Sequence, residues 1–83
     1  MQIYFTHRAA RQLEALPRSA QARIAKKMRF YARQEDPLRF AKRLADSRDG
    51  EYRFRIGDYR VTFDVKDGTI YVLKVGRRDK VYD

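Results

Sequence analysis

The chain has 83 residues, no cysteine and a single histidine, His7. A disulfide framework, a thiolate metal site and a zinc site built from several imidazoles are therefore excluded, and we expect neither a metal nor another cofactor. Twenty Lys and Arg residues against eleven Asp and Glu residues give a net charge of +9, and residues 1–50 carry +7 of it. This excess favours a polyanionic partner, which could be nucleic acid, an acidic protein or an anionic membrane surface.

The N-terminal residues MQIYFTHRAA contain no long apolar core, so we expect neither a signal peptide nor a membrane span. The length indicates one domain over residues 1–83. With no cysteine and no signal peptide expected, we expect a cytoplasmic protein.

The N-terminal half predicts one strand followed by two helices. Residues 2–6 read as a short strand, and Thr6 is a plausible N-cap for the first helix. Pro17 separates this helix from a second one. The expected apolar stripes are Ala9, Leu13 and Leu16 in the first helix, and Ala20, Ile24, Met28 and Tyr31 in the second. A short third turn follows Asp36-Pro37, with Phe40 and Leu44 expected to face inward.

The C-terminal part predicts three antiparallel strands at 51–56, 59–66 and 69–76. Gly57-Asp58 suits a two-residue type II′ or I′ turn, and Asp67-Gly68 is a strong type I′ signal. The fold class is therefore α+β, with two N-terminal helices on one face of a small antiparallel sheet in the order β-α-α-β-β-β.

The first turn fixes which side chains share a face of the sheet. It pairs Ile56 with Tyr59, Arg55 with Arg60, Phe54 with Val61, and Arg53 with Thr62. The apolar face, where the helices should dock, comprises Tyr52, Phe54, Ile56, Tyr59, Val61 and Phe63. The opposite face, called the arginine face below, comprises Arg53, Arg55, Arg60 and Thr62.

Across the second turn, the same pattern pairs Arg60 with Val75, Thr62 with Leu73, and Asp64 with Tyr71. It places Lys74 on the docking face, which predicts a bulge or an exposed strand end there. Because the strand aromatics fall mainly on the docking face, a generic RNA-binding sheet with bases stacked on aromatic residues is disfavoured.

Arg55 and Arg60 are directly opposed like charges, an arrangement that destabilises a hairpin unless an anion is bound. Pairing with Glu51 and Asp64 would neutralise two of the three arginines and still leave a surplus. Guanidinium groups grip phosphate in a bidentate manner, so we expect the arginine face to bind phosphate.

These residues resemble the RelE/ParE superfamily of bacterial toxins over nearly the whole chain. The resemblance is carried by YRFRIGDYRV and VLKVGRRDKVY, preceded by two helices and DPLRFAKRLAD. The superfamily fold is a small antiparallel sheet with two N-terminal helices on one side. RelE-like members cleave mRNA in the ribosomal A site, whereas ParE-like members inhibit DNA gyrase and are not nucleases.

The resemblance implies the candidate catalytic residues, which match by position the basic and aromatic residues of RelE-like toxins. They are Arg53, Arg55, Arg60, Arg78 and Tyr82. The hairpin is shared with ParE-like proteins, and Tyr82 favours the RelE-like reading. Arginine has no accessible neutral form to serve as a base, so the ribosome would have to orient the substrate. His7 lies at the start of the first helix and is not expected to act.

The implied function is a toxin of a type II toxin–antitoxin pair that cleaves mRNA by metal-independent attack of a 2′-OH group. Further RNA or phosphate contacts are expected from Arg77 and Lys80 in the tail and from Arg23, Lys26 and Lys27 on the second helix. The implied partners are a cognate antitoxin with an acidic or amphipathic segment, the ribosome and mRNA. The alternative is a ParE-like inhibitor whose target is DNA gyrase.

Overall fold

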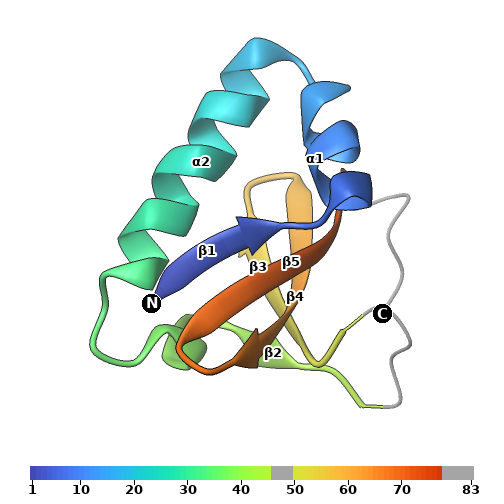
Figure 1. Cartoon of the computed structure of the whole chain (residues 1–83). Helices are drawn as coiled ribbons and strands as arrows, with labels where there is room; N and C mark the ends of the chain where they lie inside the picture. The colour runs from blue at the N-terminus through green and yellow to red at the C-terminus, as the bar shows by residue number, and fades with distance from the viewer. Residues whose placement is uncertain (46–49, 78–83) are drawn as a thin grey trace.

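The computed structural model describes residues 1–45 and 50–77 of the chain. Two helices cover one face of a five-stranded sheet (Figure 1). The elements are β1 (Gln2–Phe5), α1 (His7–Glu14), α2 (Arg18–Ala32), the 3₁₀ turn η1 (Pro37–Phe40), β2 (Lys42–Arg43), β3 (Tyr52–Ile56), β4 (Tyr59–Lys66) and β5 (Thr69–Arg77). The predicted α+β class and element order are confirmed, and the two-residue strand β2 is an addition that the sequence did not suggest.

The helix boundaries follow the capping signals. Thr6 is the N-cap of α1, where its Oγ1 accepts a hydrogen bond from the Ala9 backbone N–H at 3.2 Å. Pro17 precedes the first residue of α2 and separates the two helices. The predicted stripe of α2 is confirmed, since Ala20, Ile24, Met28 and Tyr31 are all buried. Along the first stripe Ala9 is buried, while Leu13 and Leu16 are half-buried against the core.

The strand order across the sheet is β1-β5-β4-β3-β2. All neighbouring strands are antiparallel except β1 and β5, which pair in parallel from Gln2 beside Thr69 to Phe5 beside Val72. The sheet is therefore antiparallel except at this edge, where the sequence did not predict the pairing of β1. The chain leaves β1 through the two helices before it returns to the sheet, and a long crossover of this kind permits parallel pairing.

The β3–β4 hairpin has the predicted register, including Arg55 opposite Arg60 and Arg53 opposite Thr62. In the β4–β5 hairpin, Asp64 pairs with Tyr71 as predicted. The expected pairs of Arg60 with Val75 and Thr62 with Leu73 were wrong, because a bulge between Thr62 and Phe63 shifts the register by one residue. The structure pairs Arg60 with Gly76 and Thr62 with Lys74.

The second turn has the backbone that its sequence predicts. Asp67 and Gly68 both have positive φ, at 51° and 74°, as a type I′ turn requires. At the first turn only Gly57 has positive φ (59°), which selects type II′ from the two expected types.

The core lies between the helices and the docking face of the sheet. Phe54, Val61 and Phe63 are fully buried there. The Tyr31 ring stacks on Phe54 at 4.2 Å between centroids, and Phe54 stacks on Phe63 at 4.3 Å. The expectation that Phe40 faces inward was wrong, since 46% of it is exposed. In η1 it is Pro37 that is buried, because the tight turn directs Phe40 outward against the rim of the aromatic cluster.

Candidate functional site

The three hairpin arginines leave the sheet on the face opposite the helices. Register places Arg53, Arg55 and Arg60 on one side of β3 and β4, while Phe54 and Val61 point into the core on the other side. Arg55 is exposed, Arg60 is half-buried, and Arg53 is only 8% exposed. The structure therefore brings together the three arginines that the sequence selected.

Two lysines that sequence reasoning did not assign to this face extend it. Lys42 of β2 pairs with Arg53, and Lys74 of β5 pairs with Thr62, so both share a face with the arginines. The bulge moves Lys74 away from the docking face, where an unbroken register had placed it. The bulge or exposed strand end predicted at Lys74 was the only sequence signal that this residue could lie on the other face. Nothing in the sequence pattern announced β2, so Lys42 could not be placed beforehand.

The nearby carboxylates make contacts at the margin of the arginine face. Asp64 Oδ1 accepts a hydrogen bond from the Glu51 backbone N–H at 2.7 Å. Glu51 Oε2 lies 3.8 Å from Arg43 Nη2, and both side chains are largely exposed. An exposed ion pair at this distance contributes little to stability. The basic neighbour of the Glu51 carboxylate is thus Arg43, which is not one of the three hairpin arginines.

The backbone at Gly50 packs on the middle of the arginine face. A Cβ at this position would lie 3.0 Å from Thr62 Cγ2, 3.1 Å from the Phe63 carbonyl oxygen and 3.2 Å from Leu73 Cδ1. Thr62 is accordingly only 2% exposed, although it points away from the helices. The Gly50 backbone, packed on Thr62, divides the arginine face into two parts. One is a basic part around Arg55 and Arg60, and the second lies around Asp64 and Tyr71.

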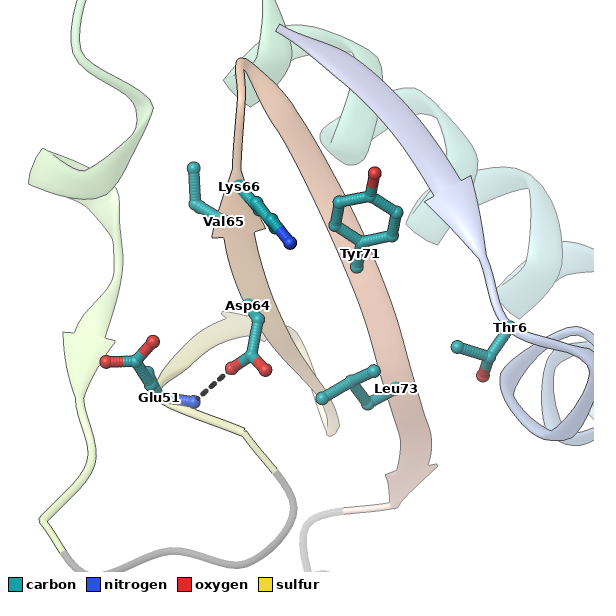
Figure 2. Close-up of a pocket in the computed structure, with 7 residues that line it drawn as sticks. All are labelled: Thr6, Glu51, Asp64, Val65, Lys66, Tyr71 and Leu73. Carbon is teal, nitrogen blue, oxygen red and sulfur yellow. Dashed lines mark hydrogen bonds between the residues drawn. The ribbon is translucent and has the colours of Figure 1, made fainter.

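The second part is a hollow of about 550 Å³ over β4 and β5. Asp64, Lys66 and Tyr71 line it together with Leu73, Thr6 and Glu51 (Figure 2). Tyr4 of β1 pairs with Tyr71, and their rings meet edge-on with centroids 5.7 Å apart. The expectation that few aromatic residues are available for base stacking therefore needs correction, because Tyr4 is 56% exposed on this face.

The basic residues predicted on the second helix lie elsewhere. Arg23, Lys26 and Lys27 are exposed on α2, where they line a hollow of about 390 Å³ with Phe30. The Lys27 ammonium lies 5.5 Å from the centre of the Phe30 ring. Since α2 covers the opposite face of the sheet, these residues form a second basic surface that is separate from the arginine face (Figure 1).

The predicted tail residues are only partly described. Arg78, Lys80 and Tyr82 lie outside the described residues. Arg77 is the last residue of β5, where it is exposed and pairs with Tyr59. Tyr59 points toward the helices, so its partner Arg77 lies on the same side of the sheet, at the end of β5.

Within residues 1–45 and 50–77, no three metal-binding side chains are grouped to hold an ion. Desolvation by burial raises the pKa of Tyr31 above its ordinary value of 10.0, which keeps this core tyrosine neutral. His7 is exposed as the first residue of α1. No helix in the described part of the chain is long and apolar enough to cross a membrane.

The fold, in which two helices pack on one face of a sheet, is shared with chains of solved toxin–antitoxin complexes. Residues 3–82 match the family described as the ParE toxin of the type II toxin–antitoxin system parDE. The toxin–antitoxin complex RelBE2 from Mycobacterium tuberculosis contains a chain that is 30% identical, with a TM-score of 0.76, and the match covers 93% of this chain and 96% of that one. A comparison with curated proteins gave no match.

Two further solved complexes contain chains of the same shape. One chain of the archaeal RelE–RelB complex from Pyrococcus horikoshii OT3 is 25% identical, with a TM-score of 0.72, and the match covers 96% of this chain and 97% of that one. One chain of the intact Escherichia coli RelBE complex is 20% identical, with a TM-score of 0.72 and coverage of 92% and 94%, which supports the fold alone.

Because the family match spans nearly the whole sequence, the chain belongs to the ParE toxin family of type II toxin–antitoxin systems. The resemblance to the RelE/ParE superfamily is thereby confirmed.

Proposed function

We propose that this toxin is a ribosome-dependent mRNA endoribonuclease whose arginine face holds the scissile phosphodiester. The observation that carries the proposal is the placement of Arg53, Arg55 and Arg60 on one sheet face, with Arg55 directly opposite Arg60. Directly opposed like charges destabilise a pair of strands, and an anion bound between two guanidinium groups offsets this cost. A phosphate that accepts bidentate hydrogen bonds relieves this repulsion.

The proposed reaction is attack of the 2′-oxygen on the adjacent phosphorus. The new O2′–P bond closes a 2′,3′-cyclic phosphate, the P–O5′ bond breaks, and the 5′-oxygen takes up a proton to leave as a hydroxyl. Arg55, Arg60 and Arg78 would stabilise the charge that gathers on the phosphate oxygens, while Arg53 would hold a flanking phosphate. Tyr82 would stack on the nucleotide or help to remove the 2′-OH proton.

The ribosome has a defined part in this proposal. Arginine cannot act as a base, and the described residues place no histidine on the arginine face. Orientation of the codon by the ribosome would supply the proximity that the weak acid–base set lacks. Activity on translating ribosomes would place the protein in the cytoplasm.

A cognate antitoxin is the proposed regulator. The similar solved chains were determined in complexes named as toxin–antitoxin pairs. The net charge of +9 favours an acidic or amphipathic antitoxin segment that covers the arginine face or displaces the tail.

Gyrase inhibition is the second candidate, and one observation favours it. The matched family is named for ParE toxins. The resemblance described above implies that ParE-like members inhibit gyrase and are not nucleases. On this reading the basic surfaces would serve binding alone, and no bond would be cleaved.

The proposal predicts that Arg60→Ala slows mRNA cleavage in a translating lysate by about 100- to 1,000-fold, the usual effect of losing one preorganised transition-state donor. Arg60→Lys should recover only part of the activity, because an ammonium keeps the charge without the planar fork. Cleavage is measured by primer extension on a defined mRNA.

Arg18→Ala is the matched control, since it removes the same charge from an exposed position on α2. It should leave cleavage within about twofold, and thermal unfolding should show that the Arg60 variants remain folded. Equal cleavage by Arg60→Ala and by the unchanged protein would contradict the assignment.

A further inference from the structure

The part of the arginine face around Tyr71 differs chemically from the part around Arg60. Tyr4 and Tyr71 lie side by side on β1 and β5 and meet edge-on, with 62° between the ring planes. Both leave the sheet on the side away from the helices, and Tyr4 is more than half exposed. Aromatic rings presented on an open sheet face are the surfaces on which unpaired RNA bases stack.

The hollow beside these rings has the size and lining of a ligand site. Its volume of about 550 Å³ is within the range of small-molecule pockets. Leu73 contributes an apolar wall, while Asp64, Lys66 and Tyr71 contribute polar groups (Figure 2). The hydrogen bond from the Glu51 N–H to Asp64 Oδ1 fixes the Asp64 carboxylate at the rim. The hollow therefore combines an aromatic surface with a positioned acceptor.

The acceptor indicates which part of a nucleotide would enter. Asp64 and Glu51 outnumber Lys66 among the charged residues that line the hollow, so the net negative charge of the lining disfavours a phosphate there. A carboxylate instead accepts hydrogen bonds from the exocyclic amino group of a base, as acidic side chains do with cytosine. The charges thus divide the face into a phosphate-binding end and a base-binding end.

The two ends are spaced for one RNA strand. Arg60 and Asp64 lie on the same side of β4, four residues apart, which corresponds to about 13 Å along a strand. Stacked nucleotides advance by roughly 3.4 Å each, so a few nucleotides cover this distance. The Gly50 backbone lies between the two ends over Thr62, which makes the hollow a bounded site and not a continuation of the basic surface.

We infer that the hollow is a base-binding subsite, in which Tyr71, with Tyr4 beside it, stacks against a single-stranded RNA base and Asp64 accepts a hydrogen bond from the amino group of that base. The inference rests on the proposed action on RNA and adds a substrate position to it. Tyr71 provides the stacking surface inside the hollow, and Tyr4 supports its edge. The site selects amino-bearing bases a few nucleotides away from the phosphate held at Arg60.

The first test measures binding of a fluorescently labelled 12-nucleotide oligo(C) RNA to the purified toxin by anisotropy, across a series of salt concentrations. Tyr71→Ala should weaken binding by roughly five- to 150-fold, the range for loss of one base–aromatic stack. The slope of log affinity against log salt should stay unchanged, because no phosphate contact is lost. Arg60→Ala should reduce that slope by about one.

Two variants control for disturbed folding. Tyr71→Phe keeps the ring and should bind nearly as the unchanged protein does, while Tyr4→Ala alters an exposed edge residue and should weaken binding without lowering the unfolding temperature. An RNA with the same length but abasic sugars should bind Tyr71→Ala and the unchanged protein equally.

The second test compares oligo(C) with oligo(U), because only cytosine carries an amino group. The unchanged protein should prefer oligo(C), and Asp64→Asn should lose the preference while its amide oxygen can still accept from the Glu51 N–H.

The outcomes separate this inference from the proposed function. If Arg60→Ala abolishes cleavage while Tyr71→Ala and Tyr4→Ala bind RNA as tightly as the unchanged protein, the base subsite is refuted and the nuclease assignment stands. A loss confined to binding of an antitoxin or gyrase would also refute it, and would show a protein-docking surface. If the unchanged protein neither cleaves mRNA nor binds RNA, the proposed function fails first.

Discussion

At Gly50 the backbone has φ of +143° and lies in close contact with the arginine face. Side chains other than hydrogen rarely tolerate this φ, and the nearest atoms to an added Cβ include a backbone carbonyl that cannot rotate away. The residue thus holds the chain entering β3 against Thr62 and against Leu73, which lines the hollow. Nothing in the sequence pattern indicated this packing.

We predict that Gly50→Ala lowers the free energy of unfolding by at least about 1 kcal/mol more than Gly68→Ala does. Gly68 is the matched control because its φ of 74° is close to the left-handed minimum and nothing lies within 4 Å of an added Cβ. Urea unfolding of both variants measures the difference. Equal losses would show that Gly50 is not held by the contacts described.

Tyr71 and Tyr4 show what residue-level reasoning could and could not find. Pairing across the Asp67-Gly68 turn already placed Tyr71 opposite Asp64, on the side of the arginines, so its position followed from strand alternation. The position of Tyr4 could not be predicted, because the sequence does not say which strand β1 pairs with. The ring pair exists only through the parallel contact between β1 and β5.

Among the elements, the two-residue turns account for most of what was predictable. The Gly57-Asp58 turn fixed every pair of the β3–β4 hairpin and therefore the separation of the arginine face from the core. The β4–β5 register failed beyond the bulge, because one extra residue reverses the faces of all later side chains on that strand. The lysine on the docking face indicated either a bulge or an exposed strand end, and it did not show where a bulge would lie.

The edge of β5 beyond the end of β1 is completed by α1. Gln12 Oε1 of α1 accepts a hydrogen bond from the Val75 backbone N–H at 2.8 Å, which satisfies an amide that has no strand partner on that side. This bond ties the helix to the strand that leads into the tail residues Arg78 and Tyr82 of the proposed site. The sequence could not identify it, because glutamine on a predicted helix is usually solvated.

We predict that Gln12→Ala lowers the free energy of unfolding by about 1–3 kcal/mol, the cost of leaving a partly buried donor without its acceptor. Gln12→Glu keeps an acceptor and should lose less. Amide hydrogen exchange at Val75 should accelerate in the alanine variant. Gln34→Ala, which removes an exposed side-chain bond to the Phe30 carbonyl, should change stability by less than about 0.5 kcal/mol. Unaltered exchange at Val75 would contradict this role for Gln12.

On the scale of the whole molecule, the positive charge is divided between two surfaces. The arginine face lies on one side of the sheet, and the exposed residues Arg23, Lys26 and Lys27 lie on α2 on the other. Composition predicted a polyanionic partner but could not show this division, which depends on how the helices dock. One surface could hold the substrate while the other contacts ribosomal RNA, a distribution that suits a small protein bound within a large RNA assembly.

Fold and target are separate questions for this family. The α+β fold and its element order followed from sequence periodicity and turn signals, and the family match agrees with them. The target did not follow, because the hairpin that builds the arginine face is shared by toxins of both kinds. In the function we propose, chemistry on RNA requires a substrate that the ribosome orients against the arginines.

The most direct test adds the purified protein separately to a translating lysate containing a defined mRNA and to a gyrase supercoiling reaction. We predict cuts in the mRNA that require ribosomes, with 2′,3′-cyclic phosphate and 5′-hydroxyl ends, and no effect on supercoiling. Intact mRNA together with inhibited supercoiling would contradict the nuclease assignment and identify the protein as a gyrase inhibitor.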